Sequence, residues 1–494
     1  MIIRSLADLG TILPDADTAG AGFSPRRAIR GVSTDSRSLK KGELFVPLAG
    51  ESFDGHDFLS VAQARGAAAA LVSRRWLEGG GEKGGGDFPL LVVDDTLEAY
   101  GRIATAHRAE FRYPVIAVAG SNGKTTTKDL LTALLATRYN VLATEGNLNN
   151  LIGVPATILR MTDEHTAAVI EIGTNAPGEI ARLCQILRPT HGVITNIGRE
   201  HLELLGSLDG VAREEGKLFE YLKENNGVAY VNIDDPYLKA MGRGLPHAVR
   251  YGRGRTADIG ARVGRLDQSG APALTIIDRR AAEPKEIALQ LGTPGIHTAT
   301  NAVAAAAIAL TLKVSPTRVK KALSEFTPRS YRAGYARLLA MVAANGARVL
   351  NDTYNSNPDS VRAALVTLAA MKPGKGGRRI AVLGDMKELG ASSAEEHRRI
   401  GREAAGDRRI DIVIFHGEEM RLAHEAARQV KDARAESLFF ARKDELSDAV
   451  AAMLKSEDIL LVKGSRGMKM EDVVRRVEGE TGGTGGRAGR REKR

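Results

Sequence analysis

A glycine-rich loop between an apolar run and a helical pattern constrains this chain more than any other feature. The apolar run covers residues 115–119, and the loop reads Gly120-Ser121-Asn122-Gly123-Lys124-Thr125-Thr126. Leucines then recur at helical spacing from 130 to 135. This order of strand, loop and helix is typical of a phosphate cradle, in which backbone N–H groups and a helix N-terminus face phosphate oxygens. The sequence therefore predicts an ATP site, with Lys124 on the β- and γ-phosphates and the Thr125 hydroxyl on Mg²⁺.

The loop departs from the general phosphate-loop pattern at one position. The pattern G-x-x-x-x-G-K-[ST] places a glycine at position 118, where this chain has Val118. The alternative interpretation is an ordinary glycine-rich turn between a strand and a helix. The agreement of strand, loop, Lys-Thr pair and helix favours the phosphate cradle.

The composition restricts the classes of protein to which the chain can belong. Its 494 residues are enough for about three domains of ~150 residues each. Cys184 is the only cysteine, so one chain cannot form a disulfide framework, and a reducing compartment is expected. We find no signal-peptide core at the N-terminus and no apolar run that approaches the ~18 residues of a membrane span. We therefore expect a cytoplasmic protein without a membrane span. We also expect a monomer.

The net charge of +10 raises the question of a nucleic-acid partner. Part of this charge lies in residues 481–494, a Gly/Arg segment that we expect to be a disordered, solvated tail, with RNA or membrane contact as the alternative. Aromatic residues make up only 4% of the chain, which argues against a stacking surface for single strands. No nucleic-acid-binding module is recognised, so no nucleic-acid partner is expected.

Strand and helix patterns alternate along most of the chain and predict an α/β protein of three domains. We expect an N-terminal α/β domain over 1–97, a central parallel sheet with the phosphate loop over 98–326, a Rossmann-like doubly wound domain over 327–480, and the tail over 481–494. The predicted strands are 44–48, 68–72, 90–93, 167–172, 192–197, 228–232, 348–350, 380–383, 410–415 and 459–462. The predicted helices are 97–111, 299–312, 360–371, 395–405, 418–430 and 446–454.

Two candidate metal ligands follow predicted strands of the central domain. Glu171 ends an apolar strand, where a carboxylate is well placed for Mg²⁺ or for a Mg²⁺-bound water; the alternative is a solvated strand-end acid. His201 follows the next strand, but a lone histidine is more often structural or exposed. Glu200 and Glu203 flank His201, and spacing alone does not rank the three.

Two polar clusters are candidates for ligand binding. Asn147, Asn149 and Asn150 form a dense amide cluster, which suits either a polar ligand or a loop of Asx turns. Asp352 begins the segment Asp352-Thr353-Tyr354-Asn355-Ser356-Asn357-Pro358 after a predicted strand. Such a position suits a ribose hydroxyl in a doubly wound sheet, and the alternative is a turn capped by Asn and Pro.

These motifs, in this order, resemble the Mur ligases of bacterial cell-wall synthesis. The resemblance runs from about residue 30 to 477 and rests on nine segments: 33–37, 50–58, 120–128, 146–155, 171–175, 196–207, 352–358, 383–390 and 462–467. It implies an ATP- and Mg²⁺-dependent amide ligase that joins D-alanyl-D-alanine to a UDP-N-acetylmuramoyl tripeptide through an acyl phosphate. Another amino-acid ligase of the superfamily, including one that acts on folate, is the nearest alternative.

The resemblance also implies roles for individual residues. Metal ligands would be Thr125, Glu171, His201 and Glu215. Catalytic residues would be Lys124, Glu171, His201 and Arg332, with Arg329 and Arg337 as rivals of Arg332 for the γ-phosphate. Nucleotide contacts would come from Gly120–Thr126, from Asn301 at adenine and from Asp352 at ribose. Substrate contacts would come from Ser36, Arg37, Asn147, Asn149, Asn355 and Asn357.

Two positions depart from the family's pattern. The family usually carries a lysine, often carbamylated, whose added carboxylate helps to place the second Mg²⁺, and the matching residue here is Glu215. Our hypothesis is that Glu215 supplies a carboxylate directly; the alternatives are that Lys217 serves after a local shift or that Glu215 is only solvated. Thr298 stands where the family commonly has Asn, which puts one adenine-side contact in doubt.

Two further classes of function remain open at this point. A phosphate-loop NTPase that works on nucleic acid would show ATPase activity stimulated by RNA or DNA and salt-sensitive binding. A non-catalytic scaffold would bind ATP without turnover.

Overall fold

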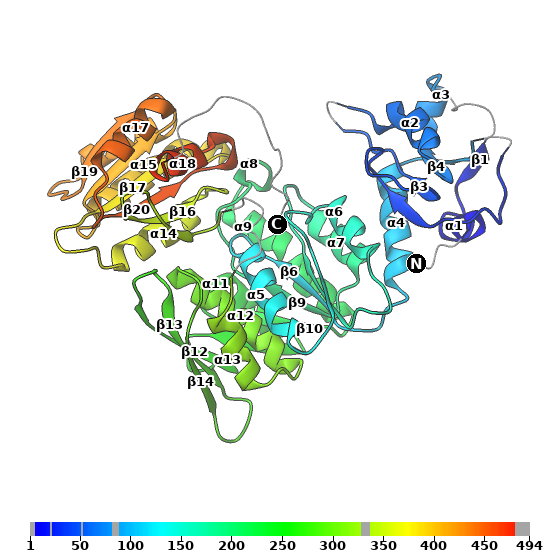
Figure 1. Ribbon diagram of the computed structural model, residues 1–494. Helices are drawn as coiled ribbons and strands as arrows, with labels where there is room; N and C mark the ends of the chain where they lie inside the picture. Colours follow the sequence, from blue (N-terminus) through cyan, green and yellow to red (C-terminus); the bar gives the residue numbers. More distant parts are fainter. Residues whose placement is uncertain (1–4, 20–21, 51–52, 82–87, 328–335, 480–494) are drawn as a thin grey trace, which may run out of the picture. The chain divides into compact units, whose positions relative to one another are not determined.

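The computed structural model describes residues 5–19, 22–50, 53–81, 88–327 and 336–479, and the expected tail lies outside these ranges. The chain divides into two compact units. The first unit comprises Met1–Ile197, Ala212–Ile259 and Ala304–Val319. The second comprises Gly198–Val211, Gly260–Val303 and Lys320–Arg494. Figure 1 labels many of the helices and strands of both units.

A five-stranded sheet in the order β1-β5-β4-β3-β2 forms the beginning of the first unit, within its described residues. Strand β1 is antiparallel to β5, and the other neighbours are parallel. Apolar clusters cover both faces, which is why its inner strands are mostly apolar. Its elements are α1 (Leu6–Ile12), β1 (Asp17–Ala19), β2 (Gly31–Ser33), β3 (Glu43–Phe45), η1 (Gly55–Phe58), α2 (Leu59–Ala64), β4 (Ala69–Ser73), α3 (Arg74–Glu78), β5 (Leu90–Val93) and α4 (Thr96–Arg108).

Parallel strands in the order β11-β10-β9-β6-β8-β7 form the rest of the sheet structure in the first unit. The strands β6, β8, β9 and β10 are almost entirely buried, and helices of this part of the chain pack apolar side chains on the sheet. The elements in this part of the chain are β6 (Val115–Ala119), α5 (Lys124–Ala136), β7 (Val141–Ala143), α6 (Gly153–Ile158), β8 (Ala167–Glu171), α7 (Glu179–Leu187), β9 (His191–Ile194), α8 (Leu202–Leu205), α9 (Leu208–Glu215), α10 (Lys217–Glu224), β10 (Val228–Asn232), α11 (Pro236–Met241), η2 (Gly242–Gly244) and β11 (Ala248–Gly252).

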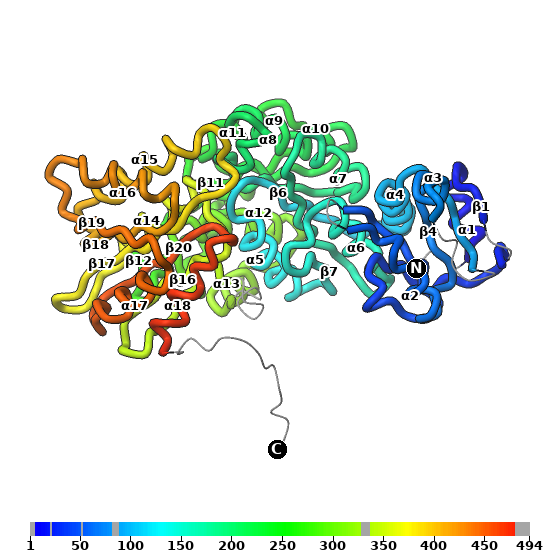
Figure 2. The backbone as a smooth tube through the Cα atoms, turned by 90° about the horizontal axis from the view of Figure 1, so that it is seen from above, coloured from blue at the N-terminus to red at the C-terminus, as the bar shows by residue number. Residues whose placement is uncertain are grey.

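The second unit contains a six-stranded sheet in the order β15-β16-β20-β17-β18-β19, again within the described residues. Only β15 is antiparallel to its neighbour. One apolar cluster joins the sheet to α14, α15 and α16 and another joins it to α17 and α18, so helices cover both faces (Figure 2). The elements are β15 (Leu339–Val342), β16 (Arg348–Asp352), α14 (Pro358–Ala370), β17 (Arg379–Gly384), η4 (Gly390–Ser392), α15 (Ser393–Gly406), β18 (Ile412–His416), α16 (Met420–Arg428), β19 (Glu436–Phe440), α17 (Lys443–Met453), β20 (Ile459–Lys463), η5 (Arg466–Met468) and α18 (Glu471–Val477).

The stretch between the two parallel sheets holds strands that the sequence reasoning missed. Strands β12 (Ile259–Leu266), β13 (Pro272–Asp278) and β14 (Lys285–Gln290) are consecutive in the sheet order, and β13 pairs with β14 in antiparallel fashion. Strand β14 alternates buried and exposed residues, and a strand with this period-two pattern contains no continuous apolar run. Helices α12 (Ile296–Thr311) and α13 (Pro316–Ser324) follow.

None of the helices within the described ranges has the length and apolar character that a bilayer crossing requires. Cys184 is buried, and burial raises the pKa of its thiol above the ordinary value. The thiol is therefore held in its protonated, unreactive form.

Candidate functional site

The phosphate loop of the first unit is held against the end of the neighbouring strand β9. The loop lies between β6 and α5, and the amide of Ser121 donates a hydrogen bond to the Asn196 carbonyl at 3.0 Å. The carbonyl of Asn122 accepts hydrogen bonds from the Thr195 hydroxyl at 2.6 Å and from the Asn196 amide nitrogen at 2.8 Å. Val118 lies inside β6, paired with the residues of β8 and β9, so the loop turns two residues later than the general pattern places it.

Gly120 allows the close approach of this loop to β9. Its φ is +108°, and a Cβ there would meet the Thr195 hydroxyl and lie 2.7 Å from the Thr195 nitrogen and 3.0 Å from the Asn196 carbonyl oxygen. Thr195 and Asn196 directly follow the buried strand β9, so a shift of their backbone would disturb the end of that strand. Glycine is therefore required at this position for steric and conformational reasons.

We expect Gly120→Ala to destabilise the protein and to weaken nucleotide binding. The left-handed backbone costs a side-chain residue roughly 1–2 kcal/mol, and the collision with the end of β9 adds about 1–3 kcal/mol of overpacking. Gly178→Ala is the matched control, because Gly178 also has a positive φ, +90°, but a Cβ at that position would have nothing within 4 Å. Thermal unfolding and ADP titration of both variants measure the difference; equal losses would contradict the steric argument.

Glu171 and Thr125 meet beside the phosphate loop. The Thr125 hydroxyl donates to Glu171 Oε1 at 3.3 Å, and the side-chain amide of Asn149 donates to the same oxygen at 2.9 Å. Glu171 is 2% exposed, and its Oε2 is buried without a hydrogen-bond partner in the described part of the chain. A buried carboxylate oxygen without a donor is unfavourable unless a proton or cation joins it. Carboxylate, hydroxyl and amide oxygens are the ligands that Mg²⁺ prefers, so the residues present fit this metal.

Two lysines near the N-terminus of α5 have different environments. Lys124 begins the helix, and its ammonium group donates to the Ser121 carbonyl at 3.4 Å. Lys128, one turn later, is buried, forms an ion pair with Asp129 at 2.9 Å and donates to the Thr144 carbonyl at 3.0 Å. Of the two, Lys124 lies on the phosphate loop, whereas Lys128 compensates a buried carboxylate.

Glu215 lies behind the loop and is fully buried. Its Oε2 accepts a hydrogen bond from the Gly120 amide at 2.8 Å. The alternative that Glu215 is merely solvated is therefore wrong. Lys217 is partly exposed, and its ammonium pairs with Glu220 at 2.6 Å. This contact does not support the alternative that Lys217 takes the place of the family's lysine.

The predicted metal ligands do not form one cluster of ionisable groups. Among the described residues, no three His, Cys, Asp or Glu side chains gather closely enough to share one metal ion. Glu171 and Glu215 belong to the first unit and His201 to the second. Mg²⁺ usually binds proteins through one or two carboxylates together with water and phosphate oxygens. The Thr125–Glu171 pair is the part of the predicted set that the structure brings together.

His201 contacts an acidic residue of the segment 383–390. Its Nδ1 lies 2.9 Å from Glu388 Oε2, and the hydrogen bond from the imidazole lowers the pKa of the Glu388 carboxyl. The Glu200 carboxylate is farther from the ring, with 4.0 Å between its Oε2 and His201 Nε2. Sequence reasoning did not single out Glu388, although the residue lies within a segment that carries the family resemblance.

Asp352 ends β16 and forms an ion pair with a buried lysine, a contact that sequence reasoning also missed. Its Oδ2 accepts from the ammonium of Lys463 at 2.7 Å, and its Oδ1 accepts from the Leu338 amide at 3.1 Å. The same ammonium donates to the Asn355 carbonyl at 2.9 Å. Lys463 is the last residue of β20 and is 2% exposed. A lysine directly after an apolar run was therefore the sequence feature that could have indicated this ion pair.

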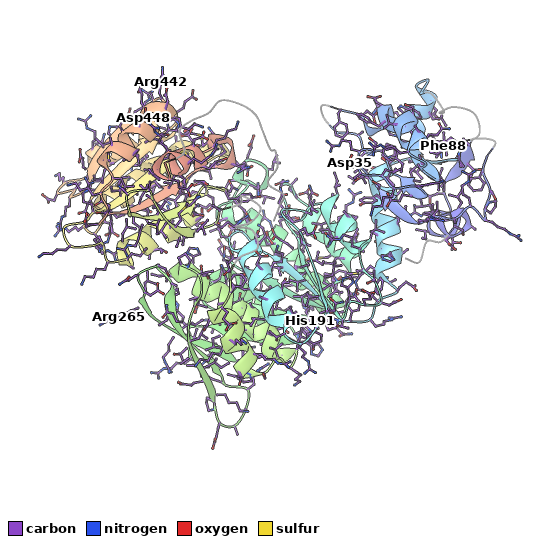
Figure 3. All side chains as sticks on the ribbon, in the orientation of Figure 1. Asp35, Phe88, His191, Arg265, Arg442 and Asp448 are labelled. Atoms are coloured by element: carbon purple, nitrogen blue, oxygen red, sulfur yellow. The ribbon has the colours of Figure 1, made fainter. Side chains whose placement is uncertain are left out.

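The remaining predicted residues are distributed over both units. Asn357 is the N-cap of α14 and accepts from the Ser360 amide, as the alternative of a capped turn expected. Arg37 is exposed and pairs at 2.9 Å with Asp35, which is labelled in Figure 3. Ser36 is buried. Asn147 is exposed, and Asn301 is buried on α12. The Thr298 hydroxyl donates a hydrogen bond to the Pro294 carbonyl, and the Arg337 guanidinium stacks on the Tyr354 ring. Arg332 and Arg329 lie outside the described residues.

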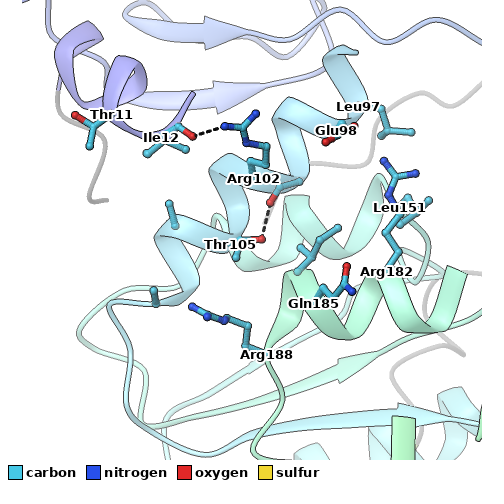
Figure 4. A pocket seen from close by; sticks show the side chains of 14 residues that line it. Thr11, Ile12, Leu97, Glu98, Arg102, Thr105, Leu151, Arg182, Gln185 and Arg188 are labelled. Carbon is cyan, nitrogen blue, oxygen red and sulfur yellow. Dashed lines mark hydrogen bonds between the residues drawn. The ribbon is translucent and has the colours of Figure 1, made fainter. Parts of the chain in front are cut away.

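A cavity of about 560 Å³ in the first unit is separate from these residues. Helices α1, α4 and α7 contribute to its wall, and the side chains of Arg102, Arg182 and Arg188 line it (Figure 4). None of the residues that line it belongs to the phosphate loop or to the Thr125–Glu171 pair. The cavity therefore does not define the candidate site.

Comparison with known proteins identifies the family. Three family models match: "Mur ligase family, catalytic domain" over residues 28–108, "Mur ligase middle domain" over 118–309, and "Mur ligase, glutamate ligase domain" over 337–466. The chain is 35% identical over 489 residues to the UDP-N-acetylmuramoyl-tripeptide–D-alanyl-D-alanine ligase of Escherichia coli (strain K12), covering 97% of this chain and 99% of that protein. This chain belongs to the Mur ligase family.

Other Mur ligases show the same similarity along the chain. The Bacillus subtilis (strain 168) protein of the same name is 35% identical over 447 residues, 90% of this chain and 93% of its own length. The crystal structure of MurF from Acinetobacter baumannii matches with a TM-score of 0.83 and 29% identity, covering 97% and 99% of the two chains. That of MurF from Thermotoga maritima in complex with ADP matches with a TM-score of 0.77 and 25% identity, covering 91% and 97%. These structures confirm the predicted three-domain α/β fold.

Proposed function

We propose that this Mur ligase joins D-alanyl-D-alanine to a UDP-N-acetylmuramoyl tripeptide, with ATP and Mg²⁺. Relatives that align over nearly the whole chain carry that name, and one similar structure was solved with ADP. When ATP is bound, it supplies the phosphoryl group that turns the tripeptide carboxylate into an acyl phosphate, which the amine of the dipeptide then attacks. Activation is necessary because a free carboxylate is a poor electrophile.

The observation that carries the proposal is the Thr125–Glu171 pair beside the phosphate loop. Thr125 and Glu171 hold Mg²⁺, and the Asn149 amide keeps the carboxylate oriented by its 2.9 Å hydrogen bond. Lys124 neutralises charge on the β- and γ-phosphates. Positive charge and positioning supply most of the catalysis in phosphoryl transfer, so these side chains would contribute directly to the first chemical step.

The proposal also assigns a separate binding function to each domain. Residues 1–97 would bind the UDP-linked substrate through Ser36 and Arg37, 98–326 would bind ATP, and 327–480 would complete the ligase site. The three matched regions support this division. Asn301 at adenine, Asp352 at ribose, His201 at the metal, Arg332 at the γ-phosphate, and Asn147, Asn355 and Asn357 at the substrate complete the assignment. A monomeric state and a cytoplasmic location remain predictions.

A ligation assay tests the proposed function directly. Purified protein is incubated with ATP, Mg²⁺, D-alanyl-D-alanine and UDP-muramoyl tripeptides that carry lysine or diaminopimelate at position three. Mass spectrometry should detect a product that contains the tripeptide and the dipeptide joined with loss of water. ADP should form only when both substrates are present. ADP formation that depends on neither substrate would contradict the proposal.

We further propose that Glu215 supplies the negative charge that a carbamylated lysine supplies in other Mur ligases. We expect Glu215→Gln to raise the Mg²⁺ concentration for half-maximal activity about 10-fold, an effect typical of a polar group next to a metal site. The glutamine keeps an oxygen for the Gly120 amide, so the loop contact remains. Removal of bicarbonate should not affect the wild type, whereas Glu215→Lys should become bicarbonate-dependent. An unchanged Mg²⁺ requirement in Glu215→Gln would count against this role.

A further inference from the structure

Two residues with strained backbones contact each other in the second unit. His201 has a φ of +47° and Glu388 a φ of +66°, and both are non-glycine residues in the left-handed region. Such a conformation is uncommon for residues other than glycine and persists where the surrounding structure enforces it. The side chains of these two residues meet at 2.9 Å, between His201 Nδ1 and Glu388 Oε2. Two strained residues joined by one hydrogen bond point to a function for the contact.

The segment that contains His201 is fixed to the same unit as Glu388 at several points. The Arg199 amide donates to Asp359 Oδ2 at 2.8 Å, and the Arg199 guanidinium lies 3.3 Å from Glu396 Oε1. Leu202 packs on the apolar cluster that includes Leu389. Backbone approach is close as well, since a Cβ at Gly390 would lie 3.0 Å from Glu203 Cα. The contact of His201 with Glu388 is therefore not an isolated surface encounter.

The segment that contains Glu388 is equally constrained. The amide of Met386 donates to His397 Nε2 at 3.0 Å, and the amide of Lys387 donates to the Ser465 hydroxyl at 2.9 Å. Met386 and Leu389 are buried on either side. Their burial fixes the backbone at Glu388, although the Glu388 side chain itself is 56% exposed. The carboxylate is thus presented to His201 by rigid backbone and remains accessible to solvent.

The chemistry of the contact determines which imidazole nitrogen can bind a cation. A carboxylate only accepts hydrogen bonds, so in the neutral imidazole the proton must reside on Nδ1. The lone pair then resides on Nε2, which is the form that a metal ligand requires. Carboxylates that hold a histidine in this way raise its basicity and orient its ring, and their loss typically weakens metal affinity 10- to 100-fold.

We propose that Glu388 is a positioning residue that sets the tautomer and ring orientation of His201 for the metal of the ligase reaction. The inference rests on the proposed function in one respect, namely that His201 is a metal ligand. Glu388 itself touches neither metal nor substrate in this assignment.

The test uses full-length protein and Mn²⁺ as the probe. Mn²⁺ binding in the presence of ADP is measured by electron paramagnetic resonance for the wild type, Glu388→Ala and Glu388→Gln. Glu395→Ala is the matched control, because Glu395 is also an exposed glutamate of this region whose ion pair, 2.7 Å to Arg402, involves no predicted ligand. Thermal unfolding of each variant reports any loss of folded protein, and the half-saturating Mg²⁺ concentration of ligation is measured in parallel.

We expect Glu388→Ala to weaken Mn²⁺ binding about 10-fold, with Glu388→Gln close to the wild type because its amide oxygen still accepts the Nδ1 proton. Glu395→Ala should leave binding unchanged. Wild-type Mn²⁺ affinity in Glu388→Ala, or a glutamine variant as weak as the alanine variant, would overturn the inference. If the wild type binds Mn²⁺ with ADP but forms no ligated product, the proposed function is refuted. The Mn²⁺ affinities of the variants would still decide whether Glu388 positions His201.

Discussion

Replacement of Lys124 by alanine is expected to lower the kcat of ligation by ~10³-fold, equivalent to about 4 kcal/mol of transition-state stabilisation. Lys124 begins α5 at the phosphate loop, and its ammonium group makes a long hydrogen bond, 3.4 Å, to the Ser121 carbonyl. Exchange of this long hydrogen bond for one to a phosphate oxygen costs little. Charge builds on the transferred phosphoryl group, so the loss should be larger in kcat than in ADP affinity.

Lys128→Ala provides the control for this prediction. Lys128 is on the same helix, but its ammonium is buried against Asp129 and the Thr144 carbonyl. Its removal leaves a buried carboxylate uncompensated and should lower the midpoint of thermal unfolding, whereas kcat per folded molecule should change only a few-fold. Steady-state kinetics, ADP titration and thermal unfolding separate the two cases. A Lys124→Ala enzyme that keeps more than about a tenth of wild-type kcat would exclude a role in phosphoryl transfer.

Parallel strands were predictable where both of their faces are buried. The more exposed parallel strands β2, β7, β11 and β19 were missed. The run predicted at 228–232 coincides with β10, and the run predicted at 90–93 coincides with β5. Strands with one exposed face were missed for the opposite reason. In β14 only Ile287 and Leu289 are buried, and the exposed residues beside them, among them Lys285, Glu286 and Gln290, leave no continuous apolar run. The prediction of alternating strands and helices was therefore wrong for residues 259–290.

The local part of the candidate site was also accessible from the sequence, whereas its long-range contacts were not. The phosphate loop and Glu171 follow from strand ends and glycine spacing. The hydrogen bond from Asn149 to Glu171 and the ion pair between Asp352 and Lys463 join residues 22 and 111 positions apart. Such pairs depend on strand order, and strand order cannot be read from periodicity. The assignment of segment 198–211 to the second unit likewise depends on pairs such as Arg199 with Asp359.

Glu171→Gln is the second variant for which we expect a large effect. The substitution keeps the size of the side chain and an oxygen that can accept from Thr125 and Asn149, so the fold around the loop should persist. It removes the negative charge of a side chain that is 2% exposed and whose Oε2 has no donor among the described residues. If that oxygen faces Mg²⁺, kcat should fall by about 10²- to 10³-fold, and the Mg²⁺ concentration for half-maximal activity should rise.

Glu214→Gln distinguishes loss of a metal ligand from loss of any buried carboxylate near the site. Glu214 is 5% exposed, and its oxygens accept from the amides of Gly178 and Ile180, both at 2.8 Å. Its substitution leaves one of these amides opposite an NH₂ group, which destabilises the protein by about 1–3 kcal/mol, without changing the Mg²⁺ requirement. Glu171→Gln should show the reverse. The substitution removes the charge of a buried carboxylate whose Oε2 has no hydrogen-bond donor among the described residues, so the protein without Mg²⁺ should be at least as stable as the wild type. Equal Mg²⁺ requirements in the two variants would remove Glu171 from the metal site.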